Sequence, residues 1–517
     1  MIFHNYMDQN ISSPQINKTK HNGIGIDILW VLVILAGFLF FTSLIPLPPN
    51  DFWWHLKIGE SIYITHSIPT TNIYAWSLPV DQPFFYAAWL GELLLYWLYR
   101  IGGMALDISM RTFLIGLSFW LVALEARRRS GSWRIAALVI TFTCLMSINN
   151  LPVRTQIWAW LPFMVTYVVL QRYSEGKISW KWLLLCPACM VFWVNVHGSF
   201  ILGLALPGIF FLGQALSKYF KQNNALPWNQ IGWIGSTMIL SGLASLINPR
   251  FMDIIRYASN LLSNQPVQQF IEEWQSPTPH GVANIAFFVS ILFFVITIAY
   301  TTHRISPTEI LLFIGFLWLA WGGQRSVIWY GMIVMPIMAR LISGLPIRVP
   351  SFTPQKNWLN LALAILLFVP VFAVQPWFVE NIPLPATYWQ QVLRGSPAGP
   401  LLSVHTPVEA TEYLRTHPGG HLFNELGYGS YLIWAIPEQG VFIDPRIELY
   451  SYDQWQDYID ISNGVHYKQI LKKYGVDRII LDLNLQPELA SLLSEDQDWI
   501  LEYQDHYAQI WSKILSP

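Results

Sequence analysis

The sequence is 517 residues long, with 53% hydrophobic and only 12% charged residues. Soluble domains carry roughly 25% charged residues, so this composition excludes an ordinary soluble protein and indicates a polytopic membrane protein. The formal net charge of −1 leaves no basic excess that would suggest a nucleic-acid partner.

The chain begins with a polar segment over residues 1–23, which we expect to be a cytoplasmic tail. An apolar run over 24–46 follows and is long enough to span a bilayer as a helix. This run is too long for the apolar core of a cleavable signal, and no Ala-x-Ala site follows it. We therefore expect a retained membrane anchor.

A polar, tryptophan-rich stretch emerges directly after this first span. Two prolines at 48–49 end the helix, and Asn50 or Asp51 is suited to cap a second one. On that second helix Asp51 and His55 lie four residues apart and share a face. The stretch is therefore a candidate site at one membrane surface.

The same stretch carries Trp54 and Lys57. Tryptophan suits the headgroup layer, where one ring edge is wet and the body is apolar. A carboxylate, an imidazole and a lysine gathered there could handle an anionic lipid-linked substrate. The alternative is that a Trp-rich amphipathic helix only anchors the protein at the interface.

Residues 48–100 form a large first loop, which ends in an amphipathic segment at 84–99 that carries Glu92 and is short for a span. Ten further apolar runs follow, at 104–126, 133–150, 155–172, 180–196, 199–220, 230–248, 282–301, 307–323, 326–343 and 358–375. With the first run they predict about 11 transmembrane helices, or 12 if 84–99 also crosses.

Basic residues set the expected orientation, because cytoplasmic loops carry an excess of Lys and Arg. With a cytoplasmic N-terminus and 84–99 lying along the membrane, most basic residues before 376 fall in cytoplasmic turns, including Arg127-Arg128-Arg129. Counting 84–99 as a span would place that run outside. We therefore predict 11 crossings and an extracytoplasmic C-terminal domain.

This orientation places several polar groups on the same face as Asp51, partly in a second loop over 249–281. They include Arg154, Asn195, His197, Glu273 and Arg325. Ionisable groups at a membrane are costly and tend to mark function, although any one of them could merely cap a helix or pair with another. We predict that together they line one cavity.

After residue 376 the pattern changes. Residues 376–400 form a Pro-rich linker, and residues 401–517 alternate helices with strands, which predicts a small α/β domain with a largely parallel sheet. Its expected helices are 408–416, 429–435, 452–474 and 486–494, and its expected strands are 421–424, 441–444, 478–482, 499–503 and 508–511. No Gly-x-Gly-x-x-Gly motif is present, so we assign no nucleotide cofactor.

The chain resembles the polytopic GT-C type glycosyltransferases, which include protein O-mannosyltransferases, Rgt-like transferases, lipid A aminoarabinose transferases and oligosaccharyltransferases. The stretch Asn50 to Lys57 is similar to the Asp-x-x-x-His-Leu-Arg type motif of the oligosaccharyltransferase loop, with Lys57 in place of arginine. The chain also resembles a group of bacterial membrane proteins at Asn195 to Gly198, Glu273 to Pro277 and Asp444-x-Arg446. The resemblance implies a multi-pass protein of a bacterial inner membrane.

Two departures from the family pattern concern the site. Relatives have a His-Glu pair near Trp89, where this chain has Ala87-Ala88, so Glu92 or Asp81 would have to supply the acidic partner. The turn at 427–431 is only faintly similar to the acceptor-binding motif of oligosaccharyltransferases.

The resemblance implies transfer of a sugar from a polyprenyl-phosphate donor, with inversion, to an acceptor outside the cytoplasm. Asp51 would act as general base or would bind Mg²⁺ or Mn²⁺, with Glu273 as a second metal ligand. His55, Lys57 and Arg325 would hold the lipid phosphate. The remaining substrate-binding candidates are Trp54, Glu92, Arg154, Asn195 and His197.

Other assignments stay open at this point. Asp444 and Arg446 are expected to form an internal ion pair in the C-terminal domain. A transporter or flippase of lipid-linked glycans is one alternative function, but it would be expected to show internal repeats, and none is evident. A non-catalytic scaffold with an α/β binding domain is another. The sugar and the acceptor are not identified.

Overall fold

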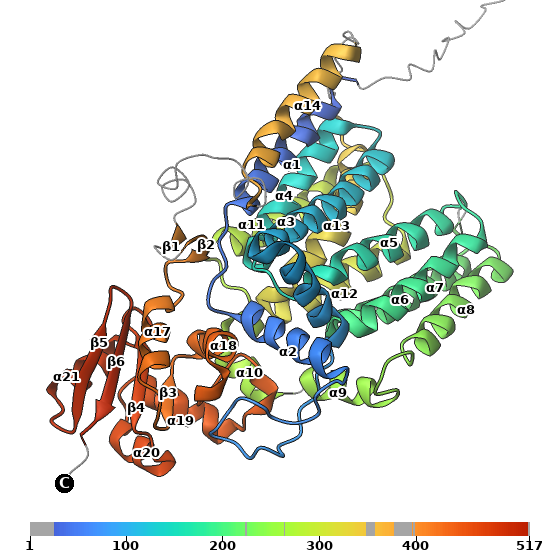
Figure 1. Cartoon of the computed structure of the whole chain (residues 1–517). Helices are drawn as coiled ribbons and strands as arrows, with labels where there is room; N and C mark the ends of the chain where they lie inside the picture. Colours follow the sequence, from blue (N-terminus) through green and yellow to red (C-terminus); the bar gives the residue numbers. More distant parts are fainter. Residues whose placement is uncertain are drawn as a thin grey trace, which may run out of the picture.

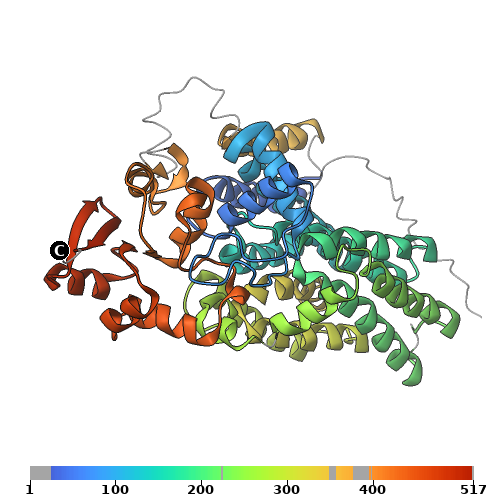
Figure 2. The ribbon, with the colours of Figure 1, turned by 60° about the horizontal axis from the view of Figure 1, so that its bottom comes forward.

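The computed structural model describes residues 25–222, 225–262, 264–347, 357–376, 395–396 and 399–514. The predicted tail and most of the predicted linker lie outside the described residues. A helical part, up to residue 376, lies beside a smaller α/β part over residues 395–396 and 399–514 (Figures 1 and 2).

Each predicted span coincides with one helix of the helical part. These helices are α1 (Ile28–Ser43), the second half of α3 (Trp89–Ser130), α4 (Trp133–Met146), α5 (Ile157–Ser174), α6 (Leu185–Val196), α7 (Ile201–Tyr219), α8 (Trp228–Ala244), α11 (Val282–Tyr300), α12 (Pro307–Gly322), α13 (Val327–Ile342) and α14 (Asn357–Ala373). By length and composition, 4 helical segments among the described residues could cross a membrane, and shorter apolar helices accompany them. The number of crossings stays a prediction.

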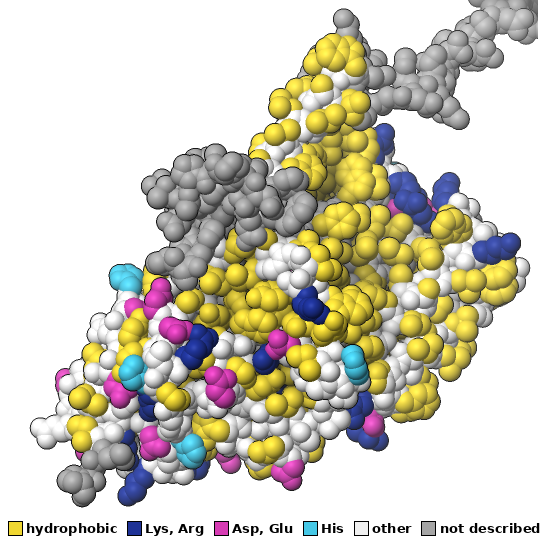
Figure 3. All heavy atoms as spheres, in the orientation of Figure 1, with side chains coloured by type: hydrophobic (Ala, Val, Ile, Leu, Met, Phe, Trp, Pro, Cys, Tyr) yellow, Lys and Arg dark blue, Asp and Glu magenta, His cyan; other side chains and the backbone are white. Residues whose placement is uncertain are grey.

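The apolar character of these helices also appears on the surface. Hydrophobic side chains cover much of the helical part, whereas acidic side chains gather over the C-terminal part (Figure 3). The centre of the helical part is α13, which is buried along nearly its whole length and packs against α3, α4 and α12. This distribution is typical of helices that face lipid outside and one another inside.

The amphipathic segment predicted at 84–99 is the first part of α3, and its helix begins at Trp89 rather than at Phe84. Helical geometry is interrupted at Gly102 and Gly103, and Gly103 has a φ of 59°. Glycine reaches this conformation without the steric penalty that a Cβ imposes. The break separates the segment that carries Glu92 from the apolar segment predicted as a span.

The two predicted loops contain short helices. The first loop holds α2 (Asp51–Thr65), and the second holds α9 (Asp253–Leu262), α10 (Gln265–Phe270) and the single 3-10 turn η4 (Glu272–Trp274). α2 packs tightly on α3, because a Cβ added at Gly59 would lie 2.2 Å from the backbone oxygen of Glu92. Only glycine allows this approach of the two backbones.

The C-terminal part is built around a four-stranded sheet in the order β3-β4-β6-β5. Its elements are β1 (Gly395–Ser396), β2 (Gly399–Ser403), α17 (Val408–Thr416), β3 (Leu422–Asn424), α18 (Leu426–Ala435), η7 (Ile447–Leu449), α19 (Tyr452–Ser462), α20 (Tyr467–Tyr474), β4 (Arg478–Asp482), α21 (Pro487–Glu495), β5 (Trp499–Gln504) and β6 (Ala508–Lys513). The predicted small α/β part is present, and its last two expected strands, β5 and β6, pair as an antiparallel hairpin.

Two expectations about this sheet are wrong. The sheet is mixed rather than largely parallel, because only β3 and β4 pair in parallel and both pairs that involve β6 are antiparallel. The apolar run 441–444 is not a strand of this sheet. It lies against the first loop instead, where Val441 forms an isolated parallel bridge with Ala75. A short buried apolar run satisfies either arrangement, so its pattern alone does not distinguish them.

The C-terminal part is docked directly on the start of α2. The Ser430 hydroxyl donates to the backbone oxygen of Asn50 and accepts from the backbone N–H of Trp54. A Cβ added at Gly427 would lie 2.3 Å from the backbone oxygen of Pro49. The glycines of the 427–431 turn are therefore explained by close packing, and this packing brings the two parts of the chain together at the candidate site.

Candidate active site

The start of α2 positions the first group of functional side chains. Asn50 precedes the helix in an extended conformation, although its side chain makes no capping bond. The Trp53 indole is buried and donates to the backbone oxygen of Pro48 at 3.0 Å, which holds the turn in place. Asp51 and His55, one helical turn apart, face the same side, as their spacing predicts.

That side of α2 forms part of a cavity of about 230 Å³, which we call the Asp51 cavity. Sequence-predicted residues from five separate segments meet there. The sequence-predicted residues that line it are Asp51, Trp54, His55, Glu92, Arg154, His197 and Arg325. The predicted convergence of these polar clusters is thus observed for most of them.

His55 and Glu92 form a buried pair in the cavity wall. The distance between His55 Nδ1 and Glu92 Oε1 is 3.0 Å, and the Trp54 ring lies against the imidazole with ring centroids 3.7 Å apart. When Glu92 is ionised, Nδ1 of His55 donates to it and Nε2 is left as an acceptor. Burial raises the pKa of Glu92, against the opposing effect of His55. In its ionised form Glu92 orients His55 and leaves Nε2 as the nitrogen that can accept a proton.

Arg154 connects two carboxylates at the edge of the cavity. Its Nη1 lies 2.8 Å from Glu273 and 3.5 Å from Asp51 Oδ2. Burial alone would raise the pKa of Glu273, but the charges of Arg154 and Arg325 outweigh it and lower this pKa. The Asp51 side chain is 28% exposed, so it remains accessible from the cavity.

This arrangement does not fit a metal centre. Arg154 stands between Asp51 and Glu273, the two predicted ligands, and supplies the positive charge that a divalent cation would bring. The part of the chain that the structure describes also contains no group of three or more His, Cys, Asp and Glu side chains with metal-binding geometry. Binding of Mg²⁺ or Mn²⁺ stays a prediction.

A second pair of basic groups lies across the cavity. His197 accepts at Nδ1 from the backbone N–H of Ser199 at 3.0 Å, so a neutral His197 carries its proton on Nε2. Burial, followed by the charges of Arg325 and Arg154, lowers the pKa of His197 well below its ordinary value. Arg325 lies over the Trp274 ring at 4.3 Å from the centroid. This region is suited to bind an anion.

Three sequence-predicted residues do not line the cavity. Lys57 lies elsewhere on α2, pairs with Glu60 at 2.6 Å and sits over the Trp434 ring. Its six-residue separation from Asp51 turns it about 240° around a helix with 3.6 residues per turn. The assignment of Lys57 to the phosphate is thereby corrected.

Asn195 and Glu273 support the cavity from outside. The Asn195 side chain accepts from the Trp89 indole at 2.8 Å and donates to two backbone carbonyls, so it ties α6 to the start of α3. Glu273 contacts Arg154 and does not line the cavity. Asn195 therefore positions the start of α3, and Glu273 positions Arg154.

Residues that were not predicted from the sequence complete the cavity on its other side. Ile447 and Glu448 of η7 line it, and Glu448 accepts from the Tyr257 hydroxyl of α9 at 2.7 Å. Tyr86 lines it as well and binds Arg446 at 3.0 Å. The Asp444-x-Arg446 motif was the available signal, since Arg446 and Asp444 form the predicted ion pair, fully buried, at 2.7 Å. No local pattern marks Tyr257.

The arrangement defines a multi-pass membrane protein with a polar cavity between its helices and an α/β domain. The apo structure of ArnT from Cupriavidus metallidurans matches this fold with a TM-score of 0.52 at 12% identity, over 94% of this chain and 98% of ArnT. Archaeal oligosaccharyltransferase AglB from Archaeoglobus fulgidus, in complex with an inhibitory peptide and a dolichol-phosphate, matches with a TM-score of 0.50 at 12% identity, over 88% of this chain and 69% of AglB.

Both of these proteins are GT-C glycosyltransferases, so the chain has the GT-C fold and the predicted resemblance is confirmed. No protein-family model matches the sequence, and no curated protein sequence matches it. The identity to the solved structures is low, and the likeness therefore concerns the fold.

Proposed function

We propose that this protein is a membrane glycosyltransferase that moves a sugar from a polyprenyl-phosphate donor to an acceptor bound at the Asp51 cavity. The observation that carries the proposal is the convergence in one cavity of an accessible carboxylate, Asp51, with the cationic group of Arg325. The GT-C fold supports it, as does the dolichol-phosphate in the AglB structure.

Asp51 is the base in this proposal. Its Oδ2 faces Arg154, and its Oδ1 takes the proton from an acceptor hydroxyl. The freed oxygen forms a bond with the anomeric carbon of the sugar from the side opposite the phosphate. The bond between that carbon and the phosphate oxygen breaks, and its electron pair leaves with the polyprenyl phosphate, which inverts the anomeric centre.

Arg325 and His197 stabilise the departing phosphate. Arg325 is a permanent cation with several N–H donors, and its place over Trp274 fixes its direction. His197 donates from Nε2 and stays neutral because its pKa is low. Donors placed where negative charge develops are worth several kcal/mol in transition-state stabilisation, about 2.7–4 for one donor.

The acceptor binds at the wall of the cavity that the C-terminal part contributes. Glu448 and Ile447 of η7 lie at this wall, beside Tyr257. The His55–Glu92 pair lies near Asp51 and offers a hydrogen-bond acceptor to a second hydroxyl of the sugar or acceptor.

The test is a transfer assay on the full chain with labelled polyprenyl-phosphate sugars and envelope acceptors. We expect Asp51→Asn to lower the transfer rate by roughly 10²–10⁴-fold, because a positioned base contributes about that much. Asp81→Asn is the matched control, since Asp81 is an exposed carboxylate of the same loop outside the cavity, and it should retain the wild-type rate.

Two results would contradict the proposal. Equal transfer by wild type and Asp51→Asn would remove Asp51 from the mechanism. Failure of undecaprenyl phosphate to bind the wild-type protein, together with no transfer from any donor, would exclude a polyprenyl-phosphate substrate.

A further inference from the structure

A second, larger cavity lies at the other ends of the helices that form the candidate active site. It has a volume of about 970 Å³, and we call it the Glu309 cavity. The start of α5 borders the Asp51 cavity, and Gln171 and Ser174 at its end line the Glu309 cavity. An 18-residue helix is about 27 Å long, so the two cavities are separated by the thickness of the helical part.

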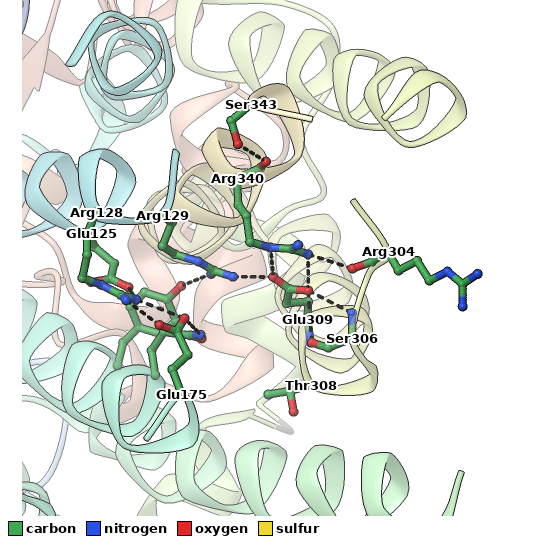
Figure 4. Close-up of polar contacts among 12 residues, drawn as sticks. Glu125, Arg128, Arg129, Glu175, Arg304, Ser306, Thr308, Glu309, Arg340 and Ser343 are labelled. Carbon is green, nitrogen blue, oxygen red and sulfur yellow. Dashed lines mark hydrogen bonds and ion pairs between the residues drawn. The ribbon is translucent and has the colours of Figure 1, made fainter. Parts of the chain in front are cut away.

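The centre of the Glu309 cavity is a carboxylate held by two arginines. Arg129 of α3 and Arg340 of α13 both bind Glu309, and Arg340 does so through two nitrogens. Glu309 also caps its own helix by accepting from Ser306. These bonds fix the guanidinium groups in place, and Figure 4 shows them gathered around Glu309.

The side chains that line this cavity carry an excess of positive charge. The lining acids are Glu175 and Glu309, and the lining cations are Arg129, Lys177, Lys221, Arg304 and Arg340. Among the described residues, no ion pair forms at Lys177, Lys221 or Arg304. Figure 4 shows the Arg304 side chain extending away from the cluster, while its backbone oxygen accepts from Arg340.

Buried polar atoms in the same wall lack partners. The Ser174 hydroxyl, Gln171 Oε1 and Arg129 Nε have no hydrogen-bond partner within the described part of the chain, and Ser174 and Gln171 are each only 7% exposed. The wall of the cavity therefore carries polar side chains as well as cations.

We propose that the Glu309 cavity binds a phosphate ester, at the membrane face opposite the candidate active site. Arginines and lysines are the usual partners of phosphate oxygens, and the hydroxyl and amide groups of the wall suit the hydroxyls of an esterified alcohol. Phe210, Phe220 and Ile305 line the same cavity and offer an apolar surface to the remainder of the ligand. The phosphate ester is either a lipid head group or a soluble compound.

The test measures binding to the full chain in an uncharged detergent. The probes are dioctanoyl phosphatidic acid, inorganic phosphate, and dioctanoylglycerol, which lacks the phosphate. We expect phosphatidic acid to bind and dioctanoylglycerol not to bind. The variant Lys177→Gln/Lys221→Gln should weaken binding about fivefold or more, because it removes two cations that line the cavity and form no ion pair within the described residues.

A matched variant controls for charge alone. Lys181→Gln/Lys472→Gln removes the same charge from exposed sites that do not line the cavity, and it should bind as wild type does. Arg325→Gln should lower binding less than the cavity variant does, because Arg325 lines the Asp51 cavity and its loss leaves the Glu309 cavity intact. Phosphatidic acid binding without phosphate binding identifies a lipid head group, and comparable binding of phosphate identifies a soluble phosphate compound.

Three results would overturn the inference. The first is that neither phosphate probe binds. The second is that the cavity variant and its charge-matched control bind equally well, and the third is that binding is lost in Arg325→Gln. The last result would place the phosphate in the Asp51 cavity and would leave the proposed function standing.

Discussion

At the scale of single residues, the buried carboxyl of Glu425 links the stability of the C-terminal part to pH. It precedes α18 and accepts from the backbone N–H of Tyr428 at 2.8 Å. Burial raises the pKa of Glu425 to about 7, against the opposing effect of backbone donors at Gly427 and Tyr428. In the unfolded chain the carboxyl returns to its ordinary value of 4.5.

The sign of the effect follows from proton binding. Between about pH 4.5 and pH 7 the folded state keeps the Glu425 proton and the unfolded state loses it. Stability therefore falls as pH rises through this window and levels off above it, by about 3 kcal/mol at most. We expect Glu425→Gln to flatten this dependence, measured as the unfolding temperature of the C-terminal part against pH.

Glu488→Gln is the control for this measurement. Glu488 is an exposed carboxyl of α21 in the same domain, and its removal should leave the pH profile unchanged. A wild-type profile without a fall between pH 4.5 and 7, or an equal fall in Glu425→Gln, would contradict the assignment.

At the scale of elements, the contact between α2 and α3 determines the geometry of the His55–Glu92 pair. We expect Gly59→Ala to destabilise the protein by about 1–3 kcal/mol, the usual cost of overpacking. The added Cβ would lie 2.2 Å from the backbone oxygen of Glu92 and 2.8 Å from Tyr96 Cβ, so the helices must separate. Thermal unfolding of the full chain measures the loss, and the transfer assay measures the effect on the site.

Gly37→Ala tests whether any helical glycine would behave in the same way. Gly37 lies in α1, and a Cβ there would meet nothing within 4 Å. The substitution should be neutral or slightly stabilising, because alanine favours helix. Equal effects of the two substitutions would show that the α2–α3 approach is not the cause.

The helices that could be predicted are those whose sequences carry short-range patterns, such as prolines, regular residue spacing and apolar runs. The prolines at 48–49 and the four-residue spacing of Asp51 and His55 predict α2 and its functional face, and the apolar runs predict the long helices. The start of α3 at Trp89 was missed because its boundary depends on how residues 84–88 pack in the first loop. The six-residue offset of Lys57 was itself a local signal, and it places Lys57 outside the cavity.

The contacts that complete the site join residues far apart in the chain, and spacing patterns carry no such information. Glu92 meets His55 across 37 residues, and Glu448 meets Tyr257 across 191. The composition of a segment could show that each residue was unusual for its place, as Arg154 and His197 were. It could not show which of them meet.

At the scale of the whole molecule, the C-terminal part completes the Asp51 cavity rather than standing apart from it. Arg446 is fully buried, binds both oxygens of Asp444 and donates to Tyr86 of the first loop. Ile447 and Glu448, which follow it directly, line the cavity. The ion pair therefore connects the fold of the α/β part to the wall of the candidate active site.

Loss of the ion pair between Asp444 and Arg446 should destabilise both the α/β part and the wall of the Asp51 cavity. We expect Arg446→Met to destabilise the C-terminal part by about 3–5 kcal/mol, because it leaves the Asp444 carboxylate buried without its counter-ion. Limited proteolysis and thermal unfolding would measure the loosening, and sugar transfer should fall with it.

The double variant Asp444→Asn/Arg446→Met should recover part of the loss, since no unpaired charge remains. Arg415→Met, at an exposed ion pair with Glu412, should change stability by less than about 0.5 kcal/mol. Unfolding of Arg446→Met at the wild-type temperature would show that the two parts of the chain are held together by their apolar contacts alone.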